Sequence, residues 1–383
     1  MNSFQIPTAI HFGTGALDWL KTLKCRHVFV VADPFVVKSG AITQITGRLE
    51  AAGVPSTIFS EVIPDPPIET VAAGVKALLA TEADVMVAIG GGSALDTAKL
   101  IREFARPMRS GNTLLRLVAI PTTSGTGSEV TSFAIVTDTA ARNKVTLVDD
   151  SLLPQDAILD VELVKTVPPA LVADTGLDVF THAMEALVSP QHNDFTDALA
   201  QKAIELVGAY LLRSYLDAGD LRARTKMHSA SCLAGMAFNA ASLGLNHGIA
   251  HTLGGHFHIP HGRANAIVLP QVIAFNAGLE PGMATSALQS THAVRAYVAC
   301  ARLLGLQSMC AATAVRALIQ WVGFMRHEMK VPASVSETGK CSEAEYRAAV
   351  PEMADAALKD RCTAGNPRPA THDQVVAILN ALW

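Results

Sequence analysis

The sequence predicts an α/β N-terminal domain with a Rossmann-like parallel sheet, followed by an all-α helical C-terminal domain. Short β-branched runs alternate with helical stretches in the first part of the chain, and long helical patterns almost without strand signals fill the second. Pro168 and Pro169 stand at the change, and proline disfavours helix at and before its own position. We therefore expect a dinucleotide-binding domain at 1–167 and a metal-binding and substrate domain at 168–383. A length of 383 residues is enough for two such cores.

The N-terminal elements are expected in strand–helix alternation with short loops. This order is typical of right-handed crossovers and of a mostly parallel, doubly wound sheet. The expected strands are at 27–32, 56–60, 84–89 and 115–120. Helices are expected at 41–52, at 69–81 and from 93 onward.

The C-terminal part repeats Ala- and Leu-rich segments whose apolar residues recur at helical spacing. These segments predict helices at 171–188, 194–218, 223–239, 244–256, 291–304, 310–328, 342–358 and 371–382.

Composition excludes several classes of protein. The net charge is −4 and there is no basic block, which argues against nucleic acid or an anionic membrane as partner. No apolar run approaches the roughly 18 residues of a membrane-spanning helix. The six cysteines are scattered without a Cys-x-x-Cys pair, as in a cytoplasmic protein with reduced thiols. An apolar content of 50% fits either a large core or a subunit interface, so a homodimer or larger homo-oligomer is also expected.

A glycine-rich loop follows the strand expected at 84–89. In the segment DVMVAIGGGSALDTAK, Gly91 and Gly92 precede a helix, and a glycine loop at a helix N-terminus lets backbone N–H groups approach a phosphate. Ser93 and Asp96 have the spacing of a capping box, so a capped helix without any ligand is the alternative. The spacing also differs from the usual G-x-G-x-x-G pattern.

A second polar loop, IPTTSGTGSE at 120–129, follows the next strand. Its hydroxyls and N–H groups suit a pyrophosphate or ribose, and a plain polar loop at the rim of the sheet is the alternative. Asp33 ends the strand at 27–32, where a carboxylate can accept hydrogen bonds from the adenosine ribose and repel a 2′-phosphate. This favours NAD over NADP, and a simple Asp-Pro turn is the alternative.

Histidines gather in the C-terminal part. Five of the thirteen lie between 247 and 261, in the run NHGIAHTLGGHFHIPHGRAN. His247 and His251 are four apart and share one helix face, whereas His261 follows Pro260 and can approach from another direction.

An acidic residue completes this set. In TGLDVFTHAMEA, Asp178 and His182 are also four apart on one helix face. A carboxylate with three imidazoles suits Fe²⁺ or Zn²⁺. A single helical histidine is more often a hydrogen-bonded polar residue than a ligand, but burying this many imidazoles without partners would be costly. Spacing alone does not say which of the five histidines are ligands, and His256 and His258 can be bystanders.

These motifs resemble the iron-dependent (group III) alcohol dehydrogenase family over nearly the whole chain. The resemblance rests on GGGSALDTAK, IPTTSGTGSEVTS, TGLDVFTHAMEA, LNHGIAHTLGGHFHIPHGRANAI and the late NPRP. Three further segments, FSEVIPDPPIETV, VSPQHNDFTDALA and KMHSASCLAGMAFN, are most similar to the propanol dehydrogenases of bacterial microcompartments. The resemblance implies the dehydroquinate-synthase-like fold of this family.

The resemblance also implies roles for individual residues. The implied metal ligands are Asp178, His182, His247 and His261, and His251 lies near the nicotinamide and the substrate. The implied NAD-binding residues are Asp33, Gly91, Gly92, Ser93, Asp96, Thr122, Thr123, Thr126 and Lys144. The sequence departs from the family at Arg263, where a small aliphatic residue is usual, and in the extra His256 and His258. These departures bear on substrate preference.

The expected reaction is reversible hydride transfer between a short primary alcohol, or its aldehyde, and NAD, with Fe²⁺ or Zn²⁺ as the metal. His251 is a candidate for passing the hydroxyl proton to solvent, or else it only shapes the pocket. Three other functions fit parts of the sequence: a glycerol, polyol or dehydroquinate-synthase-like enzyme of the same fold, an inactive scaffold subunit, and a metal-dependent hydrolase, which leaves the two loops unexplained. The resemblance places the chain in the cytoplasm and allows residence in a microcompartment, with shell or enzyme partners.

Overall fold

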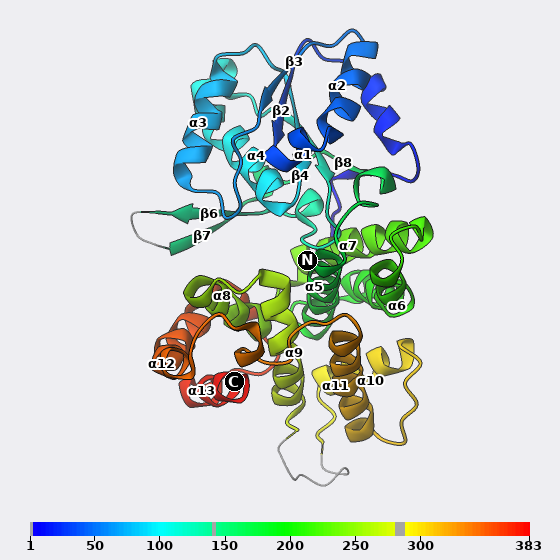
Figure 1. Cartoon of the computed structure of the whole chain (residues 1–383), viewed down its shortest axis with the longest axis vertical. Helices are drawn as coiled ribbons and strands as arrows, with labels where there is room; N and C mark the ends of the chain where they lie inside the picture. The colour runs from blue at the N-terminus through cyan, green and yellow to red at the C-terminus, as the bar shows by residue number, and fades with distance from the viewer. Residues whose placement is uncertain (1–2, 140–142, 280–287) are drawn as a thin grey trace. The chain divides into compact units, whose positions relative to one another are not determined.

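The computed structural model describes residues 3–139, 143–279 and 288–383. The chain divides into two compact units, Met1–Thr166 and Val167–Trp383. The first is built on a parallel sheet and the second is helical (Figure 1), so the fold class expected from the sequence is confirmed. In the described part of the chain, no helix combines the length and the apolar character needed to cross a membrane.

The first unit contains a six-stranded sheet in the order β1-β8-β5-β4-β2-β3, and every neighbouring pair is parallel. From β2 the chain moves outward to β3 and then returns to the other side of β2 to form β4. The space beyond the carboxyl ends of β2 and β4 is therefore a topological switch point, where open α/β sheets bind ligands. The strands are β1 (Ala9–Phe12), β2 (Val28–Ala32), β3 (Ser56–Phe59), β4 (Val85–Gly90), β5 (Arg116–Pro121) and β8 (Asp156–Leu159).

Helices cover both faces of this sheet (Figure 1). They are α1 (Pro34–Lys38), α2 (Ala41–Ala51), α3 (Ile68–Leu79) and α4 (Gly92–Ala105). An antiparallel hairpin of β6 (Phe133–Asp138) and β7 (Asn143–Val148) lies outside the main sheet, and β6 packs against α4.

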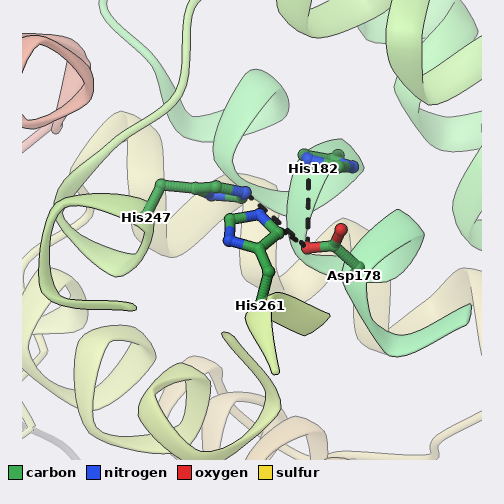
Figure 2. A group of neighbouring side chains, drawn as sticks. All are labelled: Asp178, His182, His247 and His261. Atoms are coloured by element: carbon green, nitrogen blue, oxygen red, sulfur yellow. Dashed lines mark ion pairs between the residues drawn. The ribbon is translucent and has the colours of Figure 1, made fainter. Parts of the chain in front are cut away.

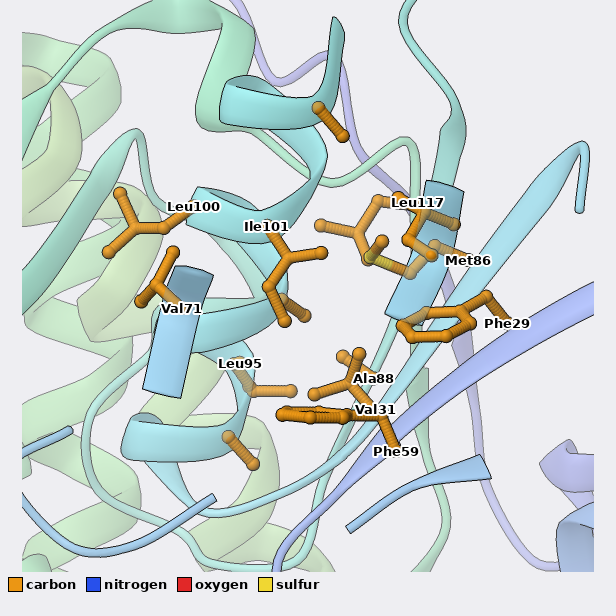
Figure 3. Close-up of a cluster of buried hydrophobic side chains, with 14 of the residues drawn as sticks. Phe29, Val31, Phe59, Val71, Met86, Ala88, Leu95, Leu100, Ile101 and Leu117 are labelled. Atoms are coloured by element: carbon orange, nitrogen blue, oxygen red, sulfur yellow. The ribbon is translucent and has the colours of Figure 1, made fainter. Parts of the chain in front are cut away.

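The core of the first unit explains why its strands read as continuous apolar runs. On one face, Phe29 and Met86 of the sheet pack against Ile101 of α4 (Figure 3). On the other face, Val30 and Ile45 belong to a second buried cluster. Because both faces are covered, every residue of β2 and β4 is buried, and hydrophobic residues fill both sides of each strand.

The second unit consists of nine α-helices among its described residues. α5 packs against α6, α7 and α9, while α8 packs against α9 and α12. The bounds are α5 (Pro169–Val188), α6 (Asp194–Leu216), α7 (Leu221–Ala241), α8 (Leu245–Phe257), α9 (His261–Ala277), α10 (His292–Leu303), α11 (Ala311–Glu328), α12 (Glu343–Lys359) and α13 (His372–Ala381).

The elements expected from the sequence agree with these bounds to within two residues at each end. The strands β1 and β8, the β6–β7 hairpin and the short helix α1 were not predicted. Helix α9, which begins directly after Pro260 and contains Pro270, was not predicted either. Proline at the first turn is compatible with a helix, whereas an interior proline removes a backbone hydrogen bond and obscures the pattern.

Candidate metal centre

The four residues expected to bind a metal lie together in the second unit. Asp178 and His182 occupy successive turns of α5, His247 lies in the first turns of α8, and His261 begins α9. The Nε2 atoms of His182, His247 and His261 lie 3.9, 3.7 and 3.6 Å from the same carboxylate oxygen, Oδ1 of Asp178 (Figure 2).

This donor set fits a divalent cation. All four ligand atoms lie within 4.8 Å of one another. Metal–ligand bonds of about 2.1 Å in a tetrahedron place neighbouring ligand atoms about 3.4 Å apart, close to the distances seen here. Three of the four side chains are buried, whereas that of His261 is 42% exposed, so the centre is open on its His261 side.

Glu185, which the sequence analysis missed, orients His247. It lies on α5, seven residues after Asp178, and its Oε2 accepts a hydrogen bond from Nδ1 of His247. This bond leaves Nε2 of His247 facing the cluster. Metal-bound histidines are commonly oriented in this way, by a carboxylate that accepts a hydrogen bond from the ring nitrogen not bound to the metal. Burial raises the pKa of Glu185 to about 8, although backbone N–H groups such as that of Asn246, 2.8 Å from Oε1, act in the opposite direction.

Burial also sets the charge state of the ligands. It holds the pKa of His247 well below the ordinary histidine value, with the nearby imidazoles of His261 and His251 acting in the same direction. His247 is therefore neutral and keeps a lone pair for a cation. Burial raises the pKa of Asp178, and nearby His182 and the amide of Asn265 oppose that shift. A carboxylate in this position has a strong need for a positive partner.

Two asparagines complete the surroundings. Nδ2 of Asn265 donates to Oδ1 of Asp178 at 2.7 Å and lies 3.1 and 3.2 Å from Nε2 of His247 and His261. Nδ2 of Asn246 donates in turn to Oδ1 of Asn265 at 2.8 Å. Both asparagines are fully buried. Their positions in the sequence could have indicated them, since each asparagine lies beside a predicted ligand. Asn246 directly precedes His247, and Asn265 is one helical turn after His261.

An ion pair holds the start of α9 against α5. Arg263 donates to both carboxylate oxygens of Asp174, at 3.2 and 3.0 Å. Between Arg263 and His261, a Cβ on Gly262 would lie 2.2 Å from the carbonyl oxygen of Asp174, so only glycine permits this approach. Asp174 and Asp178 are one helical turn apart on α5. The ion pair between Arg263 and Asp174 therefore holds His261 near Asp178. Arg263, the departure noted in the sequence, therefore has a structural partner.

The other histidines of the run are placed differently. Nδ1 of His251 donates to Oδ2 of Asp360 at 2.8 Å, and its ring stacks on that of His261 with 5.4 Å between centroids. His251 thus adjoins the four clustered side chains without joining them. His256 faces the carbonyl of Thr252, and His258 ends α8 in a left-handed conformation with φ 52°. Neither contributes to the described metal cluster.

In the first unit, the predicted cofactor residues gather at the switch point. Gly90 has a φ of +152°, and a Cβ there would lie 2.7 Å from Oδ2 of Asp33. A Cβ on Gly92 would lie 2.8 Å from Cγ2 of Thr126. The backbone N–H of Thr122 donates to the carbonyl of Gly90 at 2.9 Å. The glycine loop, the second loop and Asp33 are therefore neighbours.

Ser93 and Asp96 do not form the capping box that was the alternative to a phosphate site. That alternative is wrong, because α4 begins at Gly92 and extended Gly91 is its N-cap. Asp96 instead accepts hydrogen bonds from Oγ of Ser128 at 2.6 Å and from the N–H of Ile135 at 3.1 Å. It holds the second loop and β6 against α4. Thr123 faces Gly91, and the side chain of Lys144 lies outside the described part of the chain.

Comparison with known protein families decides the classification. The model for the iron-containing alcohol dehydrogenases matches residues 7–161, and the model for the C-terminal part of the Fe-containing alcohol dehydrogenase family matches residues 172–383. The chain belongs to the Fe-containing alcohol dehydrogenase family. The resemblance inferred from the motifs is confirmed, and the chain is an alcohol dehydrogenase with an Asp/His metal site.

Individual members of the family match this alcohol dehydrogenase over its whole length. The chain is 42% identical to 1-propanol dehydrogenase PduQ of Salmonella typhimurium over 387 residues, covering 100% of both chains. It is 37% identical to an NADPH-dependent butanol dehydrogenase of Clostridium saccharobutylicum, covering 100% of this chain and 98% of that one.

Solved structures share the fold. A 1,3-propanediol oxidoreductase superposes with a TM-score of 0.90 at 31% identity, covering 100% of both chains. A sulfoacetaldehyde reductase of Bifidobacterium kashiwanohense, solved in complex with NAD⁺, gives a TM-score of 0.84 at 25% identity, covering 100% of this chain and 98% of that one.

Proposed function

We propose that this alcohol dehydrogenase transfers hydride reversibly between a short primary alcohol, or its aldehyde, and NAD. Asp178, His182, His247 and His261 would hold the divalent cation, Fe²⁺ or Zn²⁺. The observation that carries the proposal is the approach of three imidazole nitrogens to one carboxylate oxygen, at 3.6–3.9 Å.

The residues around the centre have separate tasks in this proposal. When bound, the cation supplies Lewis-acid chemistry, drawing electron density from a substrate oxygen. Glu185 keeps Nε2 of His247 directed at the centre through the bond to Nδ1. The exposed side of His261 admits a small substrate. Because Nδ1 of His251 donates to Asp360, its Nε2 is the atom that can take up a hydroxyl proton and release it to solvent.

The first unit supplies the cofactor site. We expect the pyrophosphate of NAD at the N-terminus of α4, where the N–H groups of Gly92 and Ser93 precede the first hydrogen bonds of the helix, from Ala94 and Leu95 to the carbonyl of Gly91. Asp33 is partly exposed beside Gly90 and is placed to accept the hydroxyls of the adenosine ribose. The same carboxylate repels a 2′-phosphate, which supports NAD here even though the butanol dehydrogenase relative is NADPH-dependent.

The substrate class follows from the relatives. The 42% identity to a 1-propanol dehydrogenase supports a short aliphatic alcohol. The 1,3-propanediol oxidoreductase of the same fold makes a short diol the second candidate. 1-Propanol and 1,3-propanediol both carry a primary hydroxyl on a three-carbon chain. The two candidate substrates therefore share the same chemistry at the reacting carbon.

The test is NADH oxidation by the full chain loaded separately with Fe²⁺ and Zn²⁺. Aldehydes of increasing length are compared with 3-hydroxypropanal and with a polyol-derived ketone. We expect the highest kcat/KM for unbranched aldehydes of about three carbons. Turnover of the polyol substrate alone would favour the glycerol-dehydrogenase alternative. Absence of any NADH oxidation with either metal would support the inactive scaffold.

We further propose that the protein is a homodimer or larger homo-oligomer. β1 is an edge strand of the parallel sheet, and the side chain at its end, Phe12, is 74% exposed. Among the described residues no strand pairs with the outer edge of β1, and such an edge with an apolar side chain is suited to contact with a second copy. Light scattering at several protein concentrations tests this. Residence in the cytoplasm, or in a microcompartment with shell or enzyme partners, rests on the family resemblance and is tested by copurification with shells.

A further inference from the structure

A second group of donor atoms lies in the helical unit, beside the metal centre. It consists of His251 on α8, Asp360 and Cys362, and the three ligand atoms lie within 4.8 Å of one another. This is the same separation that the four predicted metal ligands satisfy. Cys362 has no task in the proposed function. The cluster combines an imidazole, a carboxylate and a thiol, which are the three donor types that zinc binds in proteins.

The cluster is held by backbone as well as by side chains. Asp360 caps the short 3-10 helix η8 (Arg361–Gly365), and its Oδ1 accepts from the N–H of Cys362 at 2.8 Å. Its other oxygen, Oδ2, accepts from Nδ1 of His251, also at 2.8 Å. The one carboxylate therefore fixes both of the other donors.

Close packing of α8 against η8 keeps the three donors near one another. A Cβ on Gly248 would lie 2.1 Å from Oγ1 of Thr363 and 3.0 Å from the carbonyl oxygen of Ala357. Only glycine allows the two elements to come this near. Thr363 is tied down in turn, because its Oγ1 donates to the carbonyl of Ala357 at 2.6 Å. The donors are thus brought together before any ligand arrives, although Nδ1 of His251 and Oδ2 of Asp360, now 2.8 Å apart, must separate to about 3.4 Å to hold one cation.

We propose that His251, Asp360 and Cys362 form a second cation site, which takes a soft divalent ion such as Zn²⁺ or Cd²⁺ with water as the fourth ligand. Thiolate and imidazole donors select such ions over Mg²⁺ or Ca²⁺. The ion takes the place of the hydrogen between Nδ1 of His251 and Oδ2 of Asp360. The Cys362 thiol loses its proton to solvent as the metal–sulfur bond forms, and the imidazole proton moves to Nε2. Binding therefore releases one proton in total.

The second site fills after the first. The ring of His251 stacks on that of His261, so two dications in the two sites lie close together and repel each other. The second ion therefore binds more weakly and requires an excess of metal. Where the proposed function holds, an ion on His251 also blocks proton uptake there, so excess Zn²⁺ slows turnover. Binding itself does not depend on that function.

The test is a Cd²⁺ titration of the full chain that already carries its first cation. The first site has no sulfur ligand, so a thiolate-to-cadmium absorption in the ultraviolet reports only on cysteine. We expect this absorption to saturate at one equivalent per chain. Cys362→Ser should abolish it, while Cys310→Ser, which changes an exposed cysteine on the helical unit, should retain it.

A second variant keeps the test decisive if Cys362→Ser does not fold. His251→Gln keeps the thiol but removes an imidazole donor, and should weaken Cd²⁺ binding at the thiolate by at least about tenfold. Absence of the thiolate absorption in the native chain would overturn the proposal, as would its survival in Cys362→Ser or an unchanged affinity in His251→Gln. The titration involves no alcohol or nucleotide, so it succeeds or fails independently of the dehydrogenase assay.

Discussion

Glu185 accepts a hydrogen bond from Nδ1 of His247, and both side chains are almost fully buried. The same carboxylate accepts the backbone N–H of Asn246, so Glu185 joins the last turn of α5 to the first turn of α8. It acts on the metal centre through His247, without being a ligand itself. This relationship determines which imidazole nitrogen faces Asp178.

Replacing Glu185 by glutamine should weaken metal binding. The amide can no longer accept at both oxygens, so His247 loses its fixed tautomer and orientation. We expect a 10- to 100-fold loss of metal affinity, measured by competition with a coloured chelator. Glu205→Gln, at an exposed position of α6 that pairs with Lys202, is the matched control and should bind metal like the native chain. Equal metal affinities in Glu185→Gln and Glu205→Gln would show that the hydrogen bond from His247 to Glu185 does not contribute to metal binding.

Breaking the ion pair between Arg263 and Asp174 should affect both stability and metal binding. In Arg263→Met, the Asp174 carboxylate, whose side chain is only 10% exposed, loses its two charged hydrogen bonds. We expect a loss of about 1–3 kcal/mol in the free energy of unfolding, measured by urea denaturation of the holoprotein. Metal affinity should fall as well, because the pair places His261 against Asp178.

The double variant Arg263→Met, Asp174→Leu supplies the control for this pair. It removes the uncompensated carboxylate together with its partner, so it should recover part of the lost stability. Additive losses from the two single changes would mean that the pair contributes little to the junction of α5 and α9.

Periodicity predicted most of the helices and central strands because each of them carries its pattern within its own residues. β2 and β4 are buried on both faces and are therefore continuously apolar, and α6 carries clear signals at both ends. β1 and β8 have four residues each, no fewer than the predicted β3, so their length alone does not explain why they were missed. They pair across more than 140 positions of sequence, and that contact is not encoded locally.

The same limit applies to the metal centre. Spacing four apart suggested Asp178 with His182, because both lie on one helix. The residues that orient the cluster come from distant positions: Glu185 and His247 are 62 residues apart, and His251 and Asp360 are 109 apart. The capping-box interpretation of Ser93 failed over two residues, since the N-cap of α4 is Gly91 and not Ser93.

Asp33→Ser should shift the coenzyme preference from NADH toward NADPH. Serine can still cap α1, as Asp33 does for the N–H of Val36, so the local fold should persist. Removing the negative charge abolishes its repulsion of a 2′-phosphate. We expect the ratio of kcat/KM for NADH over NADPH to fall at least about tenfold. Glu50→Gln, at an exposed position of α2, should leave the ratio as it is in the native chain. An unchanged kcat/KM ratio in Asp33→Ser would show that Asp33 does not contact the adenosine ribose.

His228 should make the protein less stable in mild acid. It lies on α7 and is only 2% exposed, and burial lowers its pKa from 6.5 to about 4. Between these two values the unfolded chain binds a proton that the folded chain does not. Stability therefore falls as the pH drops from 6.5 toward 4, with a slope of about 1.4 kcal/mol per pH unit from this residue. His228→Gln cannot titrate, so its unfolding free energy should fall less steeply over that range. His327→Gln, on the exposed surface of α11, should keep the native slope. Parallel curves for the native chain and His228→Gln would refute the assignment to His228.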